Sequence, residues 1–125
     1  MNDTRDLTTY SASKLAELIR SNVASSEEVV KAHISRIKKV NPRLNAVVVL
    51  TEKSALKSAR EADSLTQNSK SLPPLHGVPI TIKDAFEVAG VVSTGGTLGR
   101  KDYVPDTDAI AVKRLKQQSR KLIKI

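Results

Sequence analysis

The fold of this chain is decided at the stretch Leu75-His76-Gly77-Val78-Pro79-Ile80-Thr81-Ile82-Lys83-Asp84. From position 78 to position 82, apolar side chains alternate with a proline and a threonine, which is typical of a strand with one face in a core. Pro79 has no N–H to donate, so this strand is predicted to start at a sheet edge or before pairing begins. It ends at Lys83, which places an ionisable side chain at the close of an apolar segment.

Lys83 is therefore the candidate catalytic residue. A lysine that is desolvated against apolar groups can lose its proton near neutral pH and act as a base. The alternative is a solvated lysine that pairs with Asp84 or another acid. Residue type alone favours this alternative, because most lysines are solvated and perturbed groups are the minority.

Two amphipathic helices are predicted near the start of the chain. The first begins at Ser11 or Ser13, either of which can cap it, and carries apolar residues at helical spacing. The second begins with a capping box formed by Ser25 and Glu28, and it is expected to end at Asn41-Pro42. His33 on this helix has no partner at ligand spacing, so it is interpreted as a packing residue rather than a metal ligand.

An α/β fold follows from the next elements. The unbroken apolar run at residues 46–50 predicts a strand covered on both faces. Residues 51–65 predict a third helix with a narrow face of small side chains suited to packing on a sheet. Together with the strand at 78–82, this order predicts a parallel pair with a right-handed crossover.

Composition excludes several functional classes. The 125 residues include no cysteine, which excludes disulfides, thiol catalysis and cysteine-bound zinc, and no cofactor is expected. No apolar run is long enough to span a membrane, and no signal-peptide pattern opens the chain, so a cytoplasmic location is expected. The formal net charge is +8, but the excess lies after Val112, and no aromatic residue interrupts that basic cluster. A solvated helix face and basic tail are favoured over direct nucleic-acid binding.

Several motifs of this chain, in order, resemble the start of the amidase signature family. The resemblance runs from about Ser11 to about Gln117 and includes Gly77-Val78-Pro79 and Lys83-Asp84 of the central stretch. The other matching motifs are Asn41-Pro42 with Leu44-Asn45-Ala46, Ser93-Thr94-Gly95-Gly96-Thr97, and Tyr103-Val104-Pro105 with Asp108-Ala109.

The resemblance implies a Ser–Ser–Lys amide hydrolase in which Lys83 is the base. In that mechanism a nucleophilic serine attacks the carbonyl and a second serine relays its proton to the lysine. The family places its serines well downstream, and it matches residues 93–97 to a structural loop beside the active site. The pair Ser25-Ser26 lacks flanking glycines for an oxyanion hole and is interpreted as a helix cap.

The resemblance breaks after the fourth predicted helix, which opens at Asp106-Thr107-Asp108. The family continues into a buried strand, whereas this chain reads into a basic end. We expect residues 1–10 to be a loose leader, residues 11–117 to be the N-terminal part of an amidase domain, and residues 118–125 to be a divergent basic tail. The expected architecture is N-terminal helices plus the first strands of a mixed sheet, an incomplete α/β/α sandwich.

Three functional hypotheses stay open. The first is a fragment of an amidase, produced by truncation, a frameshift near Gln117 or an incomplete gene model. It is expected to be inactive alone because the nucleophile and relay serines are absent. The second is a fragment of the A subunit of the glutamine-dependent aminoacyl-tRNA amidotransferase. The third is a non-catalytic module whose first two helices bind a partner. The expected partners are a small-molecule amide for the full-length parent, and a second copy or amidotransferase subunits.

Overall fold

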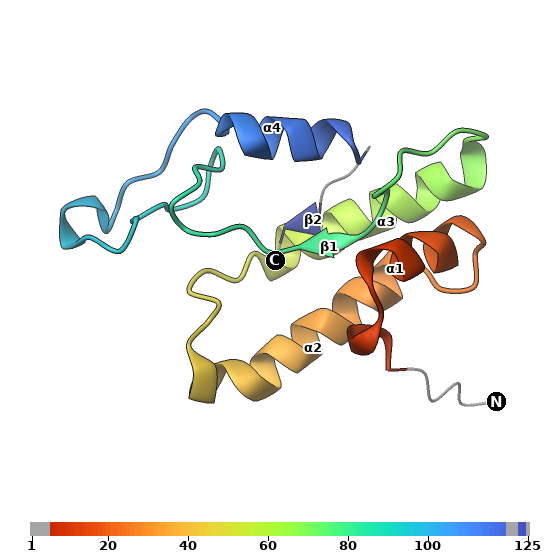
Figure 1. Cartoon of the computed structure of the whole chain (residues 1–125), viewed down its shortest axis with the longest axis horizontal. Coiled ribbons are helices and arrows are strands. Elements are labelled where there is room, and N and C mark those ends of the chain that lie inside the picture. The colour runs from red at the N-terminus through yellow and green to blue at the C-terminus, as the bar shows by residue number, and fades with distance from the viewer. Residues whose placement is uncertain (1–5, 120–122, 125) are drawn as a thin grey trace.

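The computed structural model describes residues 6–119 and the backbone of residues 123–124. Its helices are η1 (Leu7–Thr9), α1 (Ala12–Arg20), α2 (Ser26–Leu44), α3 (Glu52–Asn68), η2 (Leu98–Arg100) and α4 (Ile110–Gln117). Its strands are β1 (Pro79–Ile80) and β2 (Ile123–Lys124), which pair in parallel. The described part of the chain is mostly helical, and the short sheet lies between α4 and the other helices (Figure 1).

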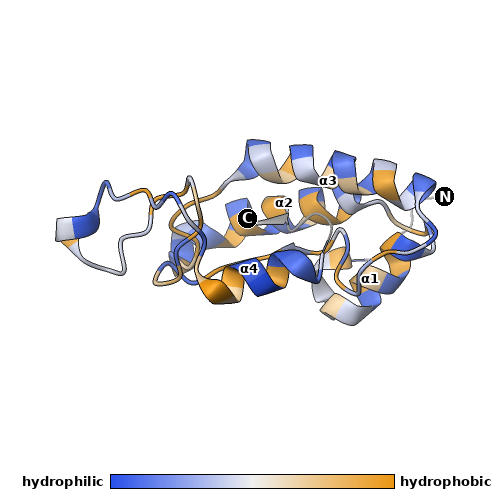
Figure 2. Cartoon of the chain, turned by 90° about the horizontal axis from the view of Figure 1, so that it is seen from above, coloured by the Kyte–Doolittle hydropathy of each residue, from blue (hydrophilic) through white to orange (hydrophobic). Residues whose placement is uncertain are grey.

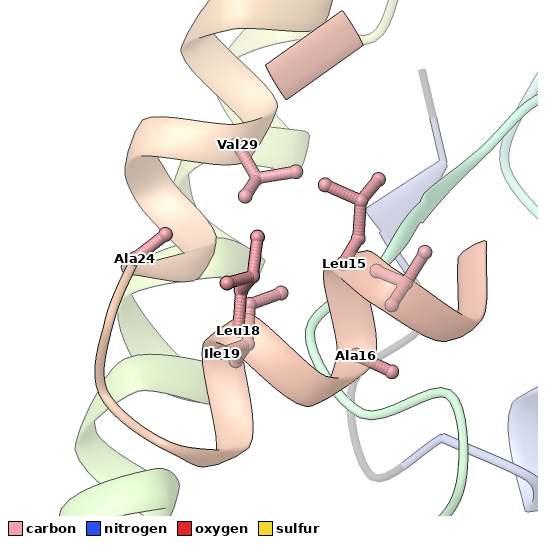
Figure 3. Packing of buried hydrophobic residues seen from close by; sticks show 7 residues of the cluster. Leu15, Ala16, Leu18, Ile19, Ala24 and Val29 are labelled. Carbon is pink, nitrogen blue, oxygen red and sulfur yellow. The ribbon is translucent and has the colours of Figure 1, made fainter. Parts of the chain in front are cut away.

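The first core cluster joins α1 to the start of α2 and to β1. The Ser11 side chain caps α1 by accepting from the Lys14 amide, which confirms the predicted start of this helix. Figure 3 shows how the apolar face of α1 meets Val29 of α2. The buried members are Leu15, Ala16, Leu18, Ile19, Ala24, Val29 and Val78.

Part of the predicted leader belongs to this cluster. Leu7 and Tyr10 pack against it, and Asp6 caps η1 by accepting from Thr8. Residues 1–5 of the expected leader lie outside the described residues. Residues 7–10 are therefore held by apolar packing, which the polar sequence around them did not indicate.

The second core cluster joins α2 to α3. Val30 and Ile34 of α2 meet Ala55 and Ala59 of α3, and all four are buried. Small side chains let the two helices approach closely, as the narrow alanine face predicts. The alanine face meets α2, and α3 also lies in contact with strand β2. The apolar stripes of α2 and α3 are visible in Figure 2. Three half-buried residues, Ile37, Leu50 and Leu56, extend the cluster.

Helix α2 does not end at Pro42 as predicted. It continues to Leu44 and stops at Asn45, whose backbone is left-handed with φ 49° and whose N–H donates to the Asn41 carbonyl. Pro42 lies inside the last turn, where it has no N–H to donate to the helix and only two helical residues follow it. The capping box at the other end is confirmed, with Ser25 and Glu28 bonded reciprocally.

The predicted strand at residues 46–50 does not form. The side chain of Asn41 holds this segment instead, because its amide donates to the Val47 carbonyl and its oxygen accepts from the amides of Ala46 and Val47. The side chain of Val48 is 65% exposed. The prediction that residues 46–50 pair in parallel with the strand at 78–82 is therefore wrong. Strand β1 pairs instead with β2, in the register Pro79 to Ile123 and Ile80 to Lys124.

Candidate active site

An open pocket of about 930 Å³ contains the predicted catalytic lysine. Three segments form its wall: residues 46–49, residues 81–86 with Val88, and residues 92–96. Most of the lining side chains are aliphatic or aromatic, including Val47, Ile82 and Phe86, and Lys83 contributes the ammonium group. An apolar pocket with few polar groups is the usual form of a small-molecule site.

Lys83 itself is exposed in this pocket. Among residues 6–119, its ammonium has no hydrogen-bond or ion-pair partner, so the alternative of a pair with Asp84 is not seen there. The expected desolvation is not seen either. The described segments line the pocket without covering it, and solvent reaches the amine.

The Asp84 side chain binds the loop at residues 93–97. Its carboxylate accepts from the Thr94 hydroxyl at 2.5 Å and from the Thr94 amide at 3.1 Å. The Thr94 hydroxyl, followed by the Thr94 amide and the amides of Gly95 and Gly96, holds the pKa of Asp84 below its usual value, although partial desolvation opposes this. The carboxylate is therefore ionised at neutral pH and already occupied by neutral donors.

The loop at 93–97 is built for this contact. Gly95 and Gly96 have φ values of 58° and 78°, which residues other than glycine rarely adopt. The hydroxyl of Ser93 donates to the Asp84 carbonyl at 2.6 Å, and the Ser93 amide donates to the Tyr103 carbonyl. The resemblance implied a structural loop beside the active site, and the loop does line the pocket with Lys83.

Helix α4 is tied to the same region by Asp108, although not as a cap. Its carboxylate accepts from the Ala89 amide at 2.9 Å and pairs with Lys116 in the last turn of α4. Ala109 occupies the N-cap position without a side-chain hydrogen bond. The helix predicted to open at Asp106-Thr107-Asp108 begins instead at Ile110, and Asp108 joins α4 to residue 89.

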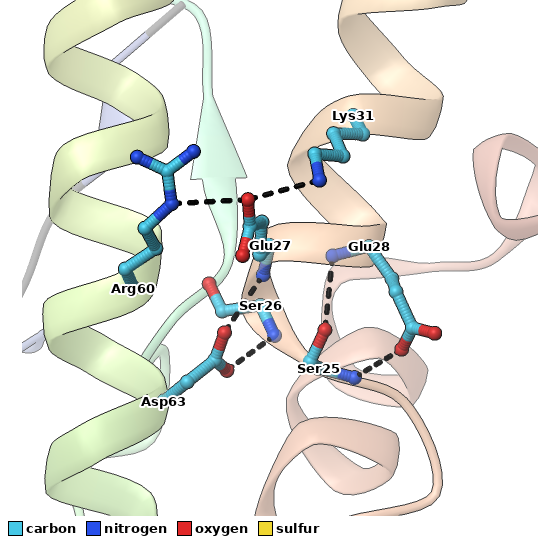
Figure 4. Close-up of polar contacts among 7 residues, drawn as sticks. All are labelled: Ser25, Ser26, Glu27, Glu28, Lys31, Arg60 and Asp63. Carbon is cyan, nitrogen blue, oxygen red and sulfur yellow. Dashed lines mark hydrogen bonds and ion pairs between the residues drawn. The ribbon is translucent and has the colours of Figure 1, made fainter.

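A second polar cluster lies behind β1. The buried hydroxyl of Ser26 donates to the Gly77 carbonyl at 2.6 Å. Asp63 of α3 accepts from the amides of Ser26 and Glu27 at 2.6 and 3.0 Å, so a carboxylate of α3 caps the start of α2 (Figure 4). Gly77 has φ 74°, and a Cβ atom there would lie 3.1 Å from the Ser26 hydroxyl.

Sequence reasoning identified Lys83 but not the residues that surround it. Asp63 and Ser26 are separated by 37 positions, and Asp84 and Thr94 by 10, so no local spacing reveals these bonds. His33 lies within α2, and its Nδ1 is 2.8 Å from the Val29 carbonyl. Ser25 is a cap as predicted, whereas Ser26 is a buried link to β1.

Metal-binding clusters and membrane spans are absent from the described ranges. Residues 6–119 hold no group of three or more histidine, cysteine or acidic side chains that could bind a metal ion. Within the described chain, no helix combines the length and apolar character needed to cross a bilayer.

Comparison with known proteins agrees with the resemblance. The model of the amidase family matches residues 28–122, so this chain belongs to the amidase family. It is 45% identical over 108 residues to the indoleacetamide hydrolase of Bradyrhizobium diazoefficiens, covering 86% of this chain and 21% of that protein. It is 38% identical over 111 residues to the A subunit of the glutamyl-tRNA(Gln) amidotransferase of Salinispora tropica, covering 89% and 23%.

Solved structures show the same fold relationship. The chain superposes on the peptide amidase of Stenotrophomonas maltophilia with a TM-score of 0.83 and 28% identity, covering 94% of this chain and 24% of that one. A solved fatty acid amide hydrolase gives a TM-score of 0.85 and 27% identity, with coverage of 94% and 21%. This chain spans a fifth to a quarter of the length of the relatives it matches. The described residues only partly show the α/β/α sandwich that was expected.

Proposed function

We propose that this chain provides the lysine base of an amide-hydrolysing site, with Lys83 as the catalytic residue. The observation that carries the proposal is the position of Lys83 in an apolar pocket, beside the loop at residues 93–97 and within the range that the amidase family matches. Its substrate would be a carboxamide whose apolar part contacts the aliphatic wall of the pocket. Cleavage of the C–N bond also requires a nucleophile and a proton relay, which the resemblance places on serines well downstream of Lys83.

In the proposed mechanism, Lys83 accepts a proton that leaves the nucleophile. A lysine must be neutral to do this, and the removal of water from its surroundings favours the neutral form. The described residues leave one side of the pocket open. We therefore propose that a covering segment, absent from the described residues, desolvates Lys83 in the complete enzyme.

A direct test uses a hybrid enzyme. Residues 28–119 of this chain would replace the corresponding residues of the indoleacetamide hydrolase, which is similar to this chain over 108 residues. Lys83→Ala in the hybrid should lower kcat for a simple carboxamide by about 10²- to 10⁴-fold, the range for loss of a general base. Lys101→Ala, at an exposed lysine outside the pocket, is the matched control. Hydrolysis that survives Lys83→Ala would remove the assignment.

An amidotransferase component is a second candidate function, because the A subunit from Salinispora tropica matches 89% of this chain. The two candidates share the base and differ in what accepts the released ammonia. Glutaminase activity of the hybrid on free glutamine, compared with its activity on a hydrophobic amide, separates them. A homodimer and a cytoplasmic location stay predictions from the sequence.

The third hypothesis, a partner-binding module on the first two helices, is less favoured. The side chains proposed to make that surface are Leu15, Leu18 and Ile34, and all three are buried in the chain's own core clusters. They pack against their neighbours and are not available to a partner while the chain is folded.

A further inference from the structure

The main chain directly after the Lys83 side chain is held by two hydrogen bonds. The Phe86 amide donates to the Lys83 carbonyl at 2.9 Å, which closes a turn directly after the lysine. The Ser93 hydroxyl donates to the Asp84 carbonyl at 2.6 Å. These bonds hold the main chain next to Lys83, which lines the pocket.

Asp84 adds side-chain contacts to this arrangement. Both of its carboxylate oxygens lie 3.1 Å from the Thr94 amide, and one accepts from the Thr94 hydroxyl. Charge-assisted hydrogen bonds of this kind are about twice as strong as neutral ones. Residue 84 is thus bound to the loop through its carbonyl and through its side chain, and the two contacts reinforce each other.

The contacts with Thr94 also bear on whether Asp84 forms an ion pair with Lys83. A free carboxylate next to a lysine would pair with the ammonium and stabilise its charged form. In this chain the carboxylate is occupied by neutral donors of the 93–97 loop, and it has no ion pair with Lys83 among the described residues. Asp84 can therefore hold the main chain next to Lys83 without forming an ion pair with the Lys83 side chain.

We propose that Asp84 is a positioning residue for Lys83: its bonds to Thr94 hold the segment that follows β1 on the 93–97 loop, so that Lys83 stays at the pocket. The relevance of this positioning to catalysis rests on the proposed function, in which Lys83 is the base. The positioning itself concerns the 125-residue chain and is measured without any reaction.

The test is backbone NMR relaxation of the ¹⁵N-labelled chain. In the parent protein the order parameter at the Lys83 amide should be near the rigid value of about 0.85, and Asp84→Asn and Thr94→Val should lower it below about 0.6. Thr94→Ser, which keeps the hydroxyl, should restore the parent value. Asp106→Asn removes an equal charge from an exposed position outside the 93–97 loop. This variant should leave the order parameter of the Lys83 amide unchanged.

The amide of Ala59 in α3 is the internal reference, because Ala59 is fully buried in the α2–α3 cluster. Loss of order at Lys83 with Ala59 unchanged supports the proposal. It is overturned if Lys83 stays rigid in Asp84→Asn and Thr94→Val, if Thr94→Ser fails to rescue, or if Ala59 loses order equally. A hybrid enzyme that remains active without Lys83 would refute the proposed function and leave this result intact.

Discussion

At the scale of single residues, Gly77 is the position that tolerates a side chain least. Its φ of 74° is rarely adopted by other residues, and a Cβ atom would lie 3.1 Å from the Ser26 hydroxyl and 3.2 Å from Cγ2 of Ile19. Gly77→Ala should lower the free energy of unfolding by about 2–4 kcal/mol, the sum of backbone strain and overpacking. Urea unfolding followed by circular dichroism measures this.

Gly90 provides the control for that variant. It has nearly the same φ, 76°, but nothing lies within 4 Å of its Cβ position. Gly90→Ala should therefore cost only the strain of about 1–2 kcal/mol. Equal losses for the two variants would show that the contacts with Ser26 and Ile19 do not matter.

The carboxylate of Asp84 predicts a pH dependence. Hydrogen bonds from Thr94 lower its pKa in the folded chain below the ordinary value of 3.8. A group with a lowered folded pKa stabilises the fold above its unfolded pKa, and that contribution is lost as the pH falls through the folded value. The Tm difference between the parent and Asp84→Asn should be constant above about pH 5 and should shrink below about pH 4.

Other groups titrate in the same range, so only this difference is informative. Asp6 and Glu27 also have lowered pKa values, the first through Thr8 and the second through Lys31. They contribute equally to the parent and to Asp84→Asn, and their effects cancel. A Tm difference that stays constant down to about pH 2 would contradict the bond between Asp84 and Thr94.

At the scale of elements, α2 depends on a carboxylate from another helix. Asp63 of α3 accepts from two amides in the first turn of α2, where unpaired N–H groups and the positive end of the helix dipole lie. Asp63→Ala should lower the free energy of unfolding by about 1–2 kcal/mol, as the loss of other caps does. Chemical denaturation is the measurement, and Ser64→Ala, at the neighbouring exposed position, should change it by less than about 0.5 kcal/mol. A loss no larger than that of Ser64→Ala would contradict the capping role.

The helices were predictable from sequence because their signals are local. Ser11 and the Ser25–Glu28 box lie at fixed spacing from the amides they cap, and the alanine face of α3 repeats with the helical period. Residues 46–50 misled the prediction because an apolar run does not reveal whether a partner strand exists. The Asn41 side chain forms hydrogen bonds with the backbone groups of Ala46 and Val47, so these groups are not available to pair with another strand.

The site was predictable only in part. Lys83 is visible in the sequence because it closes an apolar alternation and lies in a stretch that resembles a family motif. Its surroundings depend on contacts between distant segments, such as Asp84 with Thr94 and Ser26 with Gly77. Nothing in the spacing of those residues distinguishes them from solvated side chains.

At the scale of the whole molecule, the pocket leaves apolar side chains open to water. Val48 and Phe86 line it and are 65% and 50% exposed. Exposed apolar surface of this kind favours association. The chain at high concentration should self-associate, and the double variant Val48→Asp, Phe86→Asp should reduce its light scattering.

Leu98→Asp is the control, because Leu98 is more exposed but lies in η2, on the loop that projects away from the helices (Figure 1). Equal scattering by the parent and the double variant would contradict this prediction.

The central claim is that Lys83 acts by accepting a proton and not merely by carrying a positive charge. Arginine keeps the charge but cannot be deprotonated in a protein. In the hybrid enzyme, kcat and KM of Lys83→Arg for a simple carboxamide test the claim most directly. We expect kcat to fall by about 10²-fold or more while KM changes little. A Lys83→Arg hybrid that keeps the kcat of its parent would contradict the claim.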